Sequence, residues 1–494
     1  MLKKIISMIG LIAFLPVVCI AGEVNVKRLN NENWTHIETM NFNVLTNAKE
    51  KKALEIVREL EDFNYFLAFS LGYEQRALAE KVPVIVAKNK GLFNSLGIPD
   101  SYAGIFIRGV GYAVFVRCDG FMSSSEGGSN WGRTVVLHEL VHLFMENSSL
   151  VLASPPWYEE GMAEYYSTYI EKKDKVIIGD MSILRNRFYS MLKVNGRFEN
   201  VDTESLFKTS KTDINVEEKS GNDVFVNKFY ARALSVVHYM NADLDRLKLL
   251  YQYLYLLKKE FTVDEAFELV FKMTYSELDE EVNRYIRGDS MIGISFRIGK
   301  DGVEFPDMEV KRHDITKREA LEFLYTKMTM LSNTSLVNWS LDKLNADLEK
   351  LYPGLVDNML QQQLAKNPEN ISLLKWLGNV YGRMKRYSEA IDIYERVLLL
   401  DDSNAFSLNN LAWLLVTVPD MELKDPIRAI ELAEKAVSIE RSAGYLDTLA
   451  EAHYVNGSIQ KAIDIIEEAI SLKKEDNEYL KKQLEKFMAA REKL

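Results

Sequence analysis

The sequence predicts an α+β domain followed by an all-α array of helical hairpins. Three observations lead to this prediction. Short β-rich runs alternate with longer runs of helical periodicity through the first 300 or so residues. The pentapeptide HELVH, His138 to His142, lies in one of these helical runs. From about residue 368 the chain repeats itself every 34 residues or so, which is the period of helix–turn–helix arrays.

The length and charge of the chain limit the classes of protein to which it can belong. Its 494 residues are enough for two or three domains, and a hydrophobic content of 47% supplies a sizeable core. The net charge of −11 argues against a nucleic acid and against an anionic membrane surface as partner. We expect a signal peptide at 1–21, a first domain at 22–290, a hairpin and helical connecting region at 291–365, and a repeat domain at 366–494.

Residues 1–21 have the pattern of a secretory signal. Lys3 and Lys4 precede an uncharged apolar run that ends in Cys19-Ile20-Ala21, with small residues where a signal peptidase cleaves. We therefore expect an exported protein of the periplasm or cell envelope. A retained anchor is the alternative, although the run is short for a membrane span. A second alternative is lipid attachment at Cys19. We expect the protein to be held at a membrane only if this attachment takes place. After cleavage Cys118 is the remaining cysteine, so an intramolecular disulfide is excluded.

Strand-like and helix-like runs alternate through the first domain and the connecting region. β-Rich runs bounded by Gly and charged turns predict strands, and runs with a 3.6-residue apolar period predict helices. We expect strands at Phe42–Thr46, Val82–Ala87 and Lys175–Gly179, a hairpin of Ile105–Arg108 with Tyr112–Arg117, and a second hairpin of Ile294–Ile298 with Val303–Phe305. We expect helices at Ala48–Leu71, Phe229–Met240, Leu244–Lys259, Val263–Ile286, Lys317–Leu331 and Leu341–Leu364.

The HELVH segment has the spacing of a zinc-binding helix. Since a helix turns once in 3.6 residues, His138 and His142 lie on one face and can reach the same ion. Glu139 follows the first histidine and is angled toward that point without having to bind the ion. Two histidine ligands with a carboxylate that accepts a proton from water are the parts of a zinc hydrolase. The histidines are few, six in the chain, and two of them lie in this motif.

A second helical run supplies a third zinc ligand. In Pro155 to Tyr166, PPWYEEGMAEYY, Pro156 suits the first turn of a helix, and Glu160 and Glu164 share one face of it. Two histidines and one glutamate that leave the fourth position to water form a catalytic rather than a structural zinc set. We therefore predict one Zn2+ per chain.

HELVH followed by PWYEEGMAEYY resembles the gluzincin metallopeptidases, and most of all the peptidase MA-like branch in bacterial proteins with tetratricopeptide repeats. The resemblance implies a zincin-like domain with a small sheet, Glu160 as third ligand and Glu139 as general base. Glu164 falls where related enzymes orient a ligating histidine through a hydrogen bond. The spacing is one residue shorter than in aminopeptidase N-type members, so Glu164 or Glu159 remains open as the ligand. The GxMEN segment of those aminopeptidases is absent, so nothing argues for amino-terminal trimming.

Two further features of the resemblance concern the substrate. In the gluzincin plan a strand just before the HExxH helix borders the cleft, and an extended peptide could pair with its edge. The alternative is that the strands simply support the helix. The segment FYARALSVVHYM, Phe229 to Met240, is similar to a helix of the same branch, and Tyr230 could donate a hydrogen bond to the oxyanion of the tetrahedral intermediate. A packing role for Tyr230 stays open, since the chain has 24 tyrosines.

The carboxy-terminal part matches the small and large positions of the tetratricopeptide repeat three times. The matching residues are Leu377-Gly378, Tyr381, Ala390 and Tyr394; Leu411-Ala412, Ala429, Ala433 and Ala436; and Leu449-Ala450, Gly457, Ala462 and Ala469. Extra residues at Pro419 to Pro426 lengthen the second repeat. Lys473 to Leu494 is expected to close the stack as a charged final helix. Such arrays usually bind peptides or partner proteins on a concave face. The alternative is that these helices only stabilise the first domain.

Taken together, the sequence predicts an exported zinc metallopeptidase that hydrolyses peptide bonds and carries a repeat array for a protein partner. The expected partners are a peptide or protein substrate and a protein on the repeats, with no nucleic acid. The alternative is an envelope binding or assembly protein in which the array acts and the zinc domain is latent or structural. Glu139 favours catalysis, because a relic has no need of that carboxylate.

Overall fold

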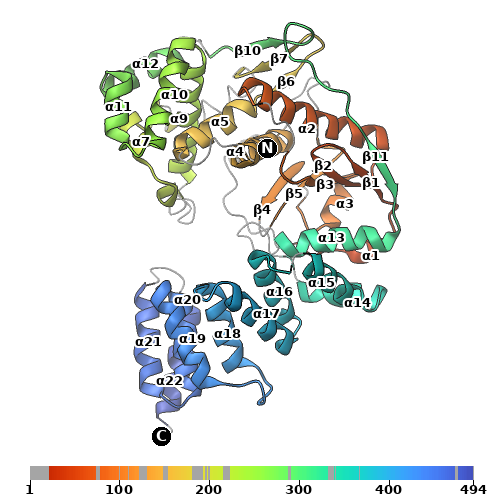
Figure 1. Ribbon diagram of the computed structural model, residues 1–494, viewed down its shortest axis with the longest axis vertical. Helices are drawn as coiled ribbons and strands as arrows, with labels where there is room; N and C mark the ends of the chain where they lie inside the picture. Colours follow the sequence, from red (N-terminus) through yellow and green to blue (C-terminus); the bar gives the residue numbers. More distant parts are fainter. Residues whose placement is uncertain are drawn as a thin grey trace, which may run out of the picture. The chain divides into compact units, whose positions relative to one another are not determined.

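The structure is a computed structural model that divides into two compact units, Met1–Ser340 and Leu341–Leu494. Figure 1 labels their elements. The structure describes residues 22–73, 78–99, 101–108, 111–121, 131–147, 154–180, 193–194, 197–198, 201–214, 223–287, 291–331, 339, 341–366, 368–472 and 477–492. The predicted signal segment, with Cys19, lies outside these ranges. Within them, no helix is both long and apolar enough to cross a membrane.

A six-stranded mixed sheet forms the framework of the first unit. Its strands are β1 (Thr35–Glu38), β2 (Phe42–Thr46), β3 (Val82–Ala87), β4 (Gly104–Arg108), β5 (Tyr112–Arg117) and β11 (Lys311–Asp314). Their order is β11-β1-β2-β3-β5-β4, with β2, β3 and β5 parallel and the other neighbours antiparallel. The predicted strands at β2 and β3 and the predicted hairpin of β4 with β5 are confirmed. Strands β1 and β11 were not predicted from the sequence, because both are short and polar.

Helices cover both faces of this sheet. They are α1 (Val26–Asn30), α2 (Glu50–Ser70), α3 (Lys90–Ser95), α4 (Trp131–Asn147) and α13 (Lys317–Leu331). Ile37, Val44 and Val114 share one core with apolar residues of α2 and α4. On the opposite face the ring of His36 lies 6.0 Å from that of Phe323 in α13. Figure 1 shows α2 on one side of the strands and α13 with α1 on the other.

Helix α2 contains a buried carboxyl group, Asp62, which is 6% exposed. Burial, followed by repulsion from Glu171, raises the pKa of Asp62 to about 7. An unfolded Asp titrates near pH 4, so the folded state binds this proton more tightly and loses stability as the pH rises through 7. We expect Asp62→Asn to raise the free energy of unfolding by up to about 4 kcal/mol at pH 8 and by little at pH 4. Urea unfolding at both pH values measures this, and an equal effect at both would contradict it.

A helical region follows the second zinc-motif helix in the first unit. Its helices are α5 (Pro156–Tyr166), α7 (Thr203–Lys208), α9 (Asp223–Asn241), α10 (Leu244–Lys258), α11 (Val263–Phe271) and α12 (Tyr275–Arg287). The single helix predicted at Val263–Ile286 is wrong. Lys272 has a φ of 52° and ends α11, and Thr274 then caps α12 by accepting a hydrogen bond from Glu277 N at 3.2 Å.

The first unit also contains two small sheets, and one of them differs from the prediction. They consist of β6 (Ile170–Glu171), β7 (Lys175–Ile178) and β10 (Ile294–Arg297), and of β8 (Lys193–Val194) with β9 (Arg197–Phe198). The predicted strand at Lys175–Gly179 is therefore present. Of the predicted hairpin of Ile294–Ile298 with Val303–Phe305, only the turn and a single bridge between Ile298 and Val303 are present, and β10 pairs with β7 instead. This pairing brings Phe296 against Phe66, with ring centroids 5.1 Å apart.

Residues 291–365, predicted to be one connecting region, are divided between the two units. β10, β11 and α13 lie in the first unit, and the second begins at Leu341. The helix predicted at Leu341–Leu364 is two helices, α14 (Leu341–Leu351) and α15 (Leu355–Lys366). Pro353 and Gly354, which has a φ of 76°, separate them.

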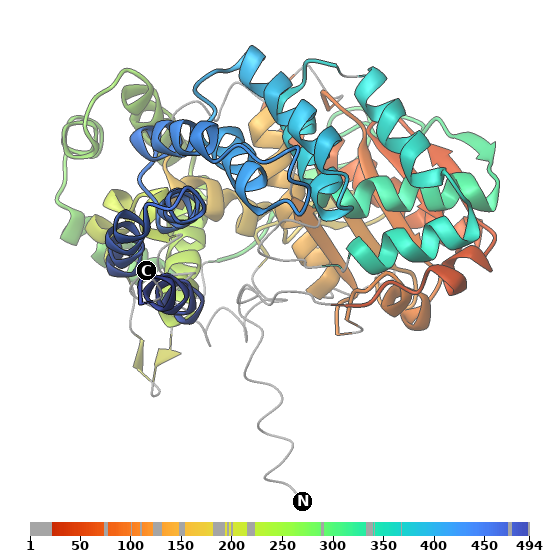
Figure 2. The ribbon, with the colours of Figure 1, turned by 90° about the horizontal axis from the view of Figure 1, so that it is seen from below.

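The second unit is an all-α array. After α14 and α15 come α16 (Ile371–Arg383), α17 (Tyr387–Leu400), α18 (Ala405–Thr417), α19 (Pro426–Ile439), α20 (Ala443–Val455), α21 (Ile459–Leu472) and α22 (Glu478–Arg491). Helix α18 begins 34 residues after α16 (405 − 371) and α20 begins 38 after α18 (443 − 405), as the extra residues near Pro419 imply. In Figure 2 the dark blue helices at the end of the chain are seen nearly end-on, side by side.

Small residues allow the paired helices of the array to approach closely. A Cβ on Gly378 of α16 would lie 2.7 Å from the ring of Tyr394 in α17. Ala412 and Ala450, at the corresponding positions of the two later pairs, are fully buried. Phe487 of α22 is also fully buried, with its ring 4.8 Å from that of Tyr454. The final helix thus closes the stack, as predicted.

Candidate metal centre

The HELVH segment lies in α4, and its two histidines share one face of that helix as predicted. The Nε2 atoms of His138 and His142 are 3.2 Å apart, and the ring centroids are 4.9 Å apart. His138 is buried, at 5% exposure. The two rings therefore present one nitrogen each to the same point.

Helix α5 brings Glu160 to that point. Its Oε2 atom is 3.3 Å from Nε2 of His138 and 3.3 Å from Nε2 of His142. This oxygen is buried and makes no hydrogen bond. Ligands about 2.0–2.1 Å from a tetrahedral zinc lie about 3.3–3.4 Å from one another. The three donor atoms, at 3.2–3.3 Å, therefore fit zinc, and the unsatisfied carboxylate oxygen is what a bound cation would satisfy.

The charges of these groups favour a cation among them. Burial by itself would lower the pKa of His142, but attraction to Glu160 outweighs it and raises that pKa to about 9. Burial by itself would raise the pKa of Glu160, but the charge of His142 holds it well below its usual range. The carboxylate is therefore ionised, and a proton or a metal ion can balance its charge.

The other two predicted carboxylates lie around the same centre. Glu164 of α5 is buried, and its Oε1 is 3.5 Å from Nδ1 of His138, on the side of the ring away from Glu160. Glu139 is partly exposed, and its charge contributes to the raised pKa of His142. Glu159, the other alternative ligand, has Oε2 at 3.8 Å from Nζ of Lys211. The carboxylate oxygen that contacts both ring nitrogens is thus that of Glu160.

Helix α9 brings Tyr230 beside the histidines. Its ring centroid is 6.3 Å from that of His138, and the side chain is 6% exposed. Gly161 of α5 makes this possible, since a Cβ there would lie 2.5 Å from Val237 Cγ2 and 2.7 Å from the carbonyl oxygen of Ala233 in α9. The Gly in WYEEGMAEYY therefore fixes how closely the helix that carries Tyr230 approaches.

Two contacts that hold α4 in place were not found from the sequence. Arg133 is 1% exposed, and its guanidinium donates to Glu59 Oε1 of α2 at 2.7 Å and to the carbonyl oxygen of Tyr169 at 2.7 Å. At the start of α4, a Cβ on Gly132 would lie 2.3 Å from the backbone nitrogen of Gly104 in β4. A charged residue within an apolar helix was the available signal, but its partner lies 74 residues away.

His238 of α9 is not part of this centre. Its Nδ1 is 2.8 Å from Tyr285 Oη, and its Nε2 is 2.7 Å from the carbonyl oxygen of Gly179. Burial lowers its pKa. Both ring nitrogens of His238 are therefore occupied by hydrogen-bond contacts that join α9 to its neighbours.

Comparisons with known proteins establish the repeat. A profile of the tetratricopeptide repeat matches residues 374–404, which lie within α16 and α17 and the residues just beyond. No curated protein matches the chain. Two similar solved structures are a thermophilic TPR protein of Thermus thermophilus (13% identity, 35% of this chain and 91% of that one, TM-score 0.26) and yeast Tom70 (13% identity, 63% and 57%, TM-score 0.32). The chain thus contains a tetratricopeptide repeat, and the metallopeptidase resemblance of the first unit stays a prediction.

Proposed function

We propose that the protein is an exported zinc metallopeptidase of the gluzincin type. The observation that supports this most is the triangle of His138 Nε2, His142 Nε2 and Glu160 Oε2, with sides of 3.2–3.3 Å, contributed by an HExxH helix and the helix after it. Two imidazole nitrogens and an ionised carboxylate oxygen that converge on one point are the donor set that zinc prefers.

Each residue of the centre has a role in this proposal. His138, His142 and Glu160 would hold zinc, which when bound supplies Lewis acidity and lowers the pKa of a coordinated water. Glu139 would accept the proton of the attacking water and deliver it to the leaving amine. Tyr230 would donate a hydrogen bond to the oxygen that becomes negatively charged.

The peptide substrate would lie along β4. This strand pairs with β5 on one side and ends the sheet among the described strands. It also contacts the start of α4, where Gly104 and Gly132 meet. An extended peptide that adds to the free edge of β4 would pass the metal-binding helix.

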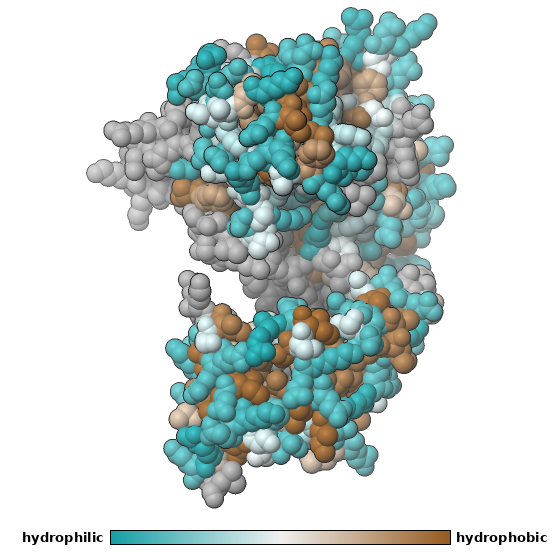
Figure 3. Space-filling view, turned by 60° about the vertical axis from the view of Figure 1, so that its left-hand side comes forward, coloured by the Kyte–Doolittle hydropathy of each residue, from teal (hydrophilic) through white to brown (hydrophobic). Residues whose placement is uncertain are grey.

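The tetratricopeptide repeat indicates that the second unit binds protein. On the face of this unit in the lower half of Figure 3, apolar side chains are interspersed with hydrophilic ones. Leu399, Met421 and Ile427 are large apolar side chains at 67–87% exposure in this unit. This supports the second candidate function, in which an envelope protein binds or assembles partners through the array and its zinc domain is latent.

One experiment separates the two candidates. The mature protein is assayed for zinc content and for cleavage of unfolded proteins, before and after a chelator removes the metal. A peptidase contains one zinc in the first unit's centre and loses cleavage with it, recovering both when zinc returns. Zinc without cleavage would instead favour the binding protein, and absence of zinc would overturn the metal centre.

Glu164 provides a further test through zinc affinity. We expect Glu164→Ala to weaken zinc binding about 10- to 100-fold, because His138 loses the carboxylate that faces its Nδ1. Competition with a chromophoric chelator measures the change. Glu159→Ala, on the same helix but facing Lys211, is the control and should bind zinc as the wild type does. Equal affinities for the two variants would show that Glu164 does not position the ligand.

A further inference from the structure

A second group of metal-ligating side chains lies on the outer strands of the sheet. His36 and Glu38 belong to β1, two residues apart, and so point to the same face. His313 of β11 is directly opposite His36 in the antiparallel register. One ligand atom from each of the three lies within 4.8 Å of the other two.

The contacts within this group place possible metal-ligand atoms of different side chains close together. The ring centroids of His36 and His313 are 5.3 Å apart, and His313 Nε2 is 3.7 Å from Glu38 Oε1. Nε2 of His36 contacts Asn43 Oδ1 on β2. This contact resembles the one by which a metal-bound histidine is usually oriented, in which one ring nitrogen meets an oxygen acceptor.

We propose that His36, Glu38 and His313 form a second Zn2+ site, separate from the centre on α4 and α5. Two imidazoles and a carboxylate suit a borderline ion such as Zn2+ better than Ca2+ or Mg2+, which prefer oxygen alone. Of the six histidines in the chain, four then serve in two sets of two histidines and one glutamate. The proposal is independent of the peptidase activity, because none of these residues contacts the first centre.

The ion would fasten an edge strand. β11 pairs with β1 although about 275 residues separate them in the chain. Ligands from both strands would join them through the metal, in addition to the backbone hydrogen bonds of the ladder. The second site is thus structural: it stabilises the attachment of β11, and α13 follows that strand directly.

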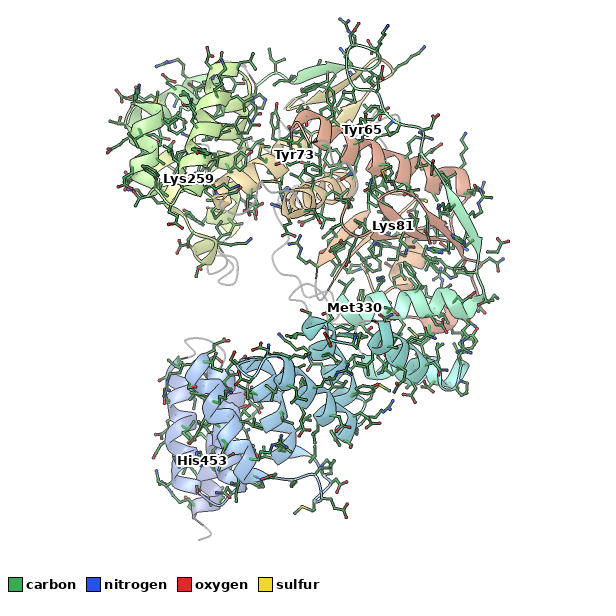
Figure 4. All side chains as sticks on the ribbon, viewed as in Figure 1. Tyr65, Tyr73, Lys81, Lys259, Met330 and His453 are labelled. Atoms are coloured by element: carbon green, nitrogen blue, oxygen red, sulfur yellow. The ribbon has the colours of Figure 1, made fainter. Side chains whose placement is uncertain are left out.

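Lys81 makes this site weaker than the first. Its Nζ donates to Glu38 Oε2 at 3.0 Å, so a cation is already present at the other carboxylate oxygen. Figure 4 labels Lys81 in the sheet region of the first unit. Removing this charge should tighten zinc binding roughly tenfold, since the repulsion between the two cations disappears.

Zinc titration of the full mature protein tests the proposal. We expect His313→Ala to bind one zinc fewer than Arg312→Ala, whatever the first centre binds. Arg312 is the matched control: it is the neighbouring residue on β11, both side chains are 49% exposed, and Arg312 contacts Glu50 rather than Glu38. Equal zinc content in the two variants would overturn the proposal.

Two additional measurements identify the ligands. In ring-nitrogen NMR spectra of the protein, the signals of His36 and His313 should shift together as the weaker zinc equivalent is added, and Lys81→Met should lower its dissociation constant. His138→Ala should remove the stronger equivalent and leave this response unchanged. If His36 and His313 do not respond to Zn2+, the proposal fails even when the first centre binds its ion.

Discussion

Glu139→Gln is expected to abolish peptide hydrolysis while the protein keeps its zinc. The amide has the size of the carboxylate but cannot accept the proton of the attacking water, and general acid–base catalysis contributes about 10²- to 10⁴-fold to such rates. Glu139 does not contribute one of the three ligand atoms that converge on the metal position, so the zinc affinity of the Glu139→Gln variant should change little. Loss of its negative charge near His142 works against zinc binding only weakly, since Glu160 is the largest attractive contribution there.

The measurement compares cleavage rates and zinc content of the wild type, Glu139→Gln and Glu146→Gln. Glu146 lies on the same helix and contacts Arg108 at 2.5 Å with its side chain 45% exposed, so the same chemical change there should leave the rate unaltered. A Glu139→Gln variant that loses its zinc, or one that cleaves as fast as the wild type, would remove Glu139 from the role of general base.

Arg133→Met is expected to destabilise the first unit by about 3–5 kcal/mol. The substitution leaves Glu59 as a buried charge without its ion-pair partner at 2.6 Å, and the carbonyl oxygen of Tyr169 loses a donor. Because Arg133 lies in the helix that carries His138 and His142, the variant should also bind zinc less tightly. The double variant Arg133→Met with Glu59→Leu should recover most of the loss, since it removes both charges.

Urea unfolding followed by a probe in the first unit measures these changes. Arg108→Met is the matched control, because it removes the same side chain from an exposed pair with Glu146 and should cost less than about 1 kcal/mol. If Arg133→Met were as stable as Arg108→Met, the buried pair would not be what holds α4 against α2.

The sequence was sufficient to predict the parts of the site that depend on local periodicity. The four-residue spacing of His138 and His142 places both on one face of any helix, and Pro156 begins the helix that carries Glu160. Small residues at 34-residue intervals predicted the paired helices of the second unit in the same way, and the match at 374–404 confirms the first of them. The helix breaks at Lys272 and Gly354 were missed because one residue in a left-handed conformation outweighs the apolar period.

By itself, then, the sequence determined where the long helices of the site and of the repeats lie and which side chains of one helix share a face, because these properties follow from the nearest few residues. The tertiary structure alone decided which strands distant in the sequence pair and which charges meet. β10 joins β7, β11 joins β1, Arg133 meets Glu59, and His313 faces His36. Each of these contacts joins residues far apart in the chain, so it depends on how the whole unit folds and not on the nearest few residues. For the buried pair of Arg133 and Glu59 the physical reason is that a charge inside the core needs a partner of opposite charge.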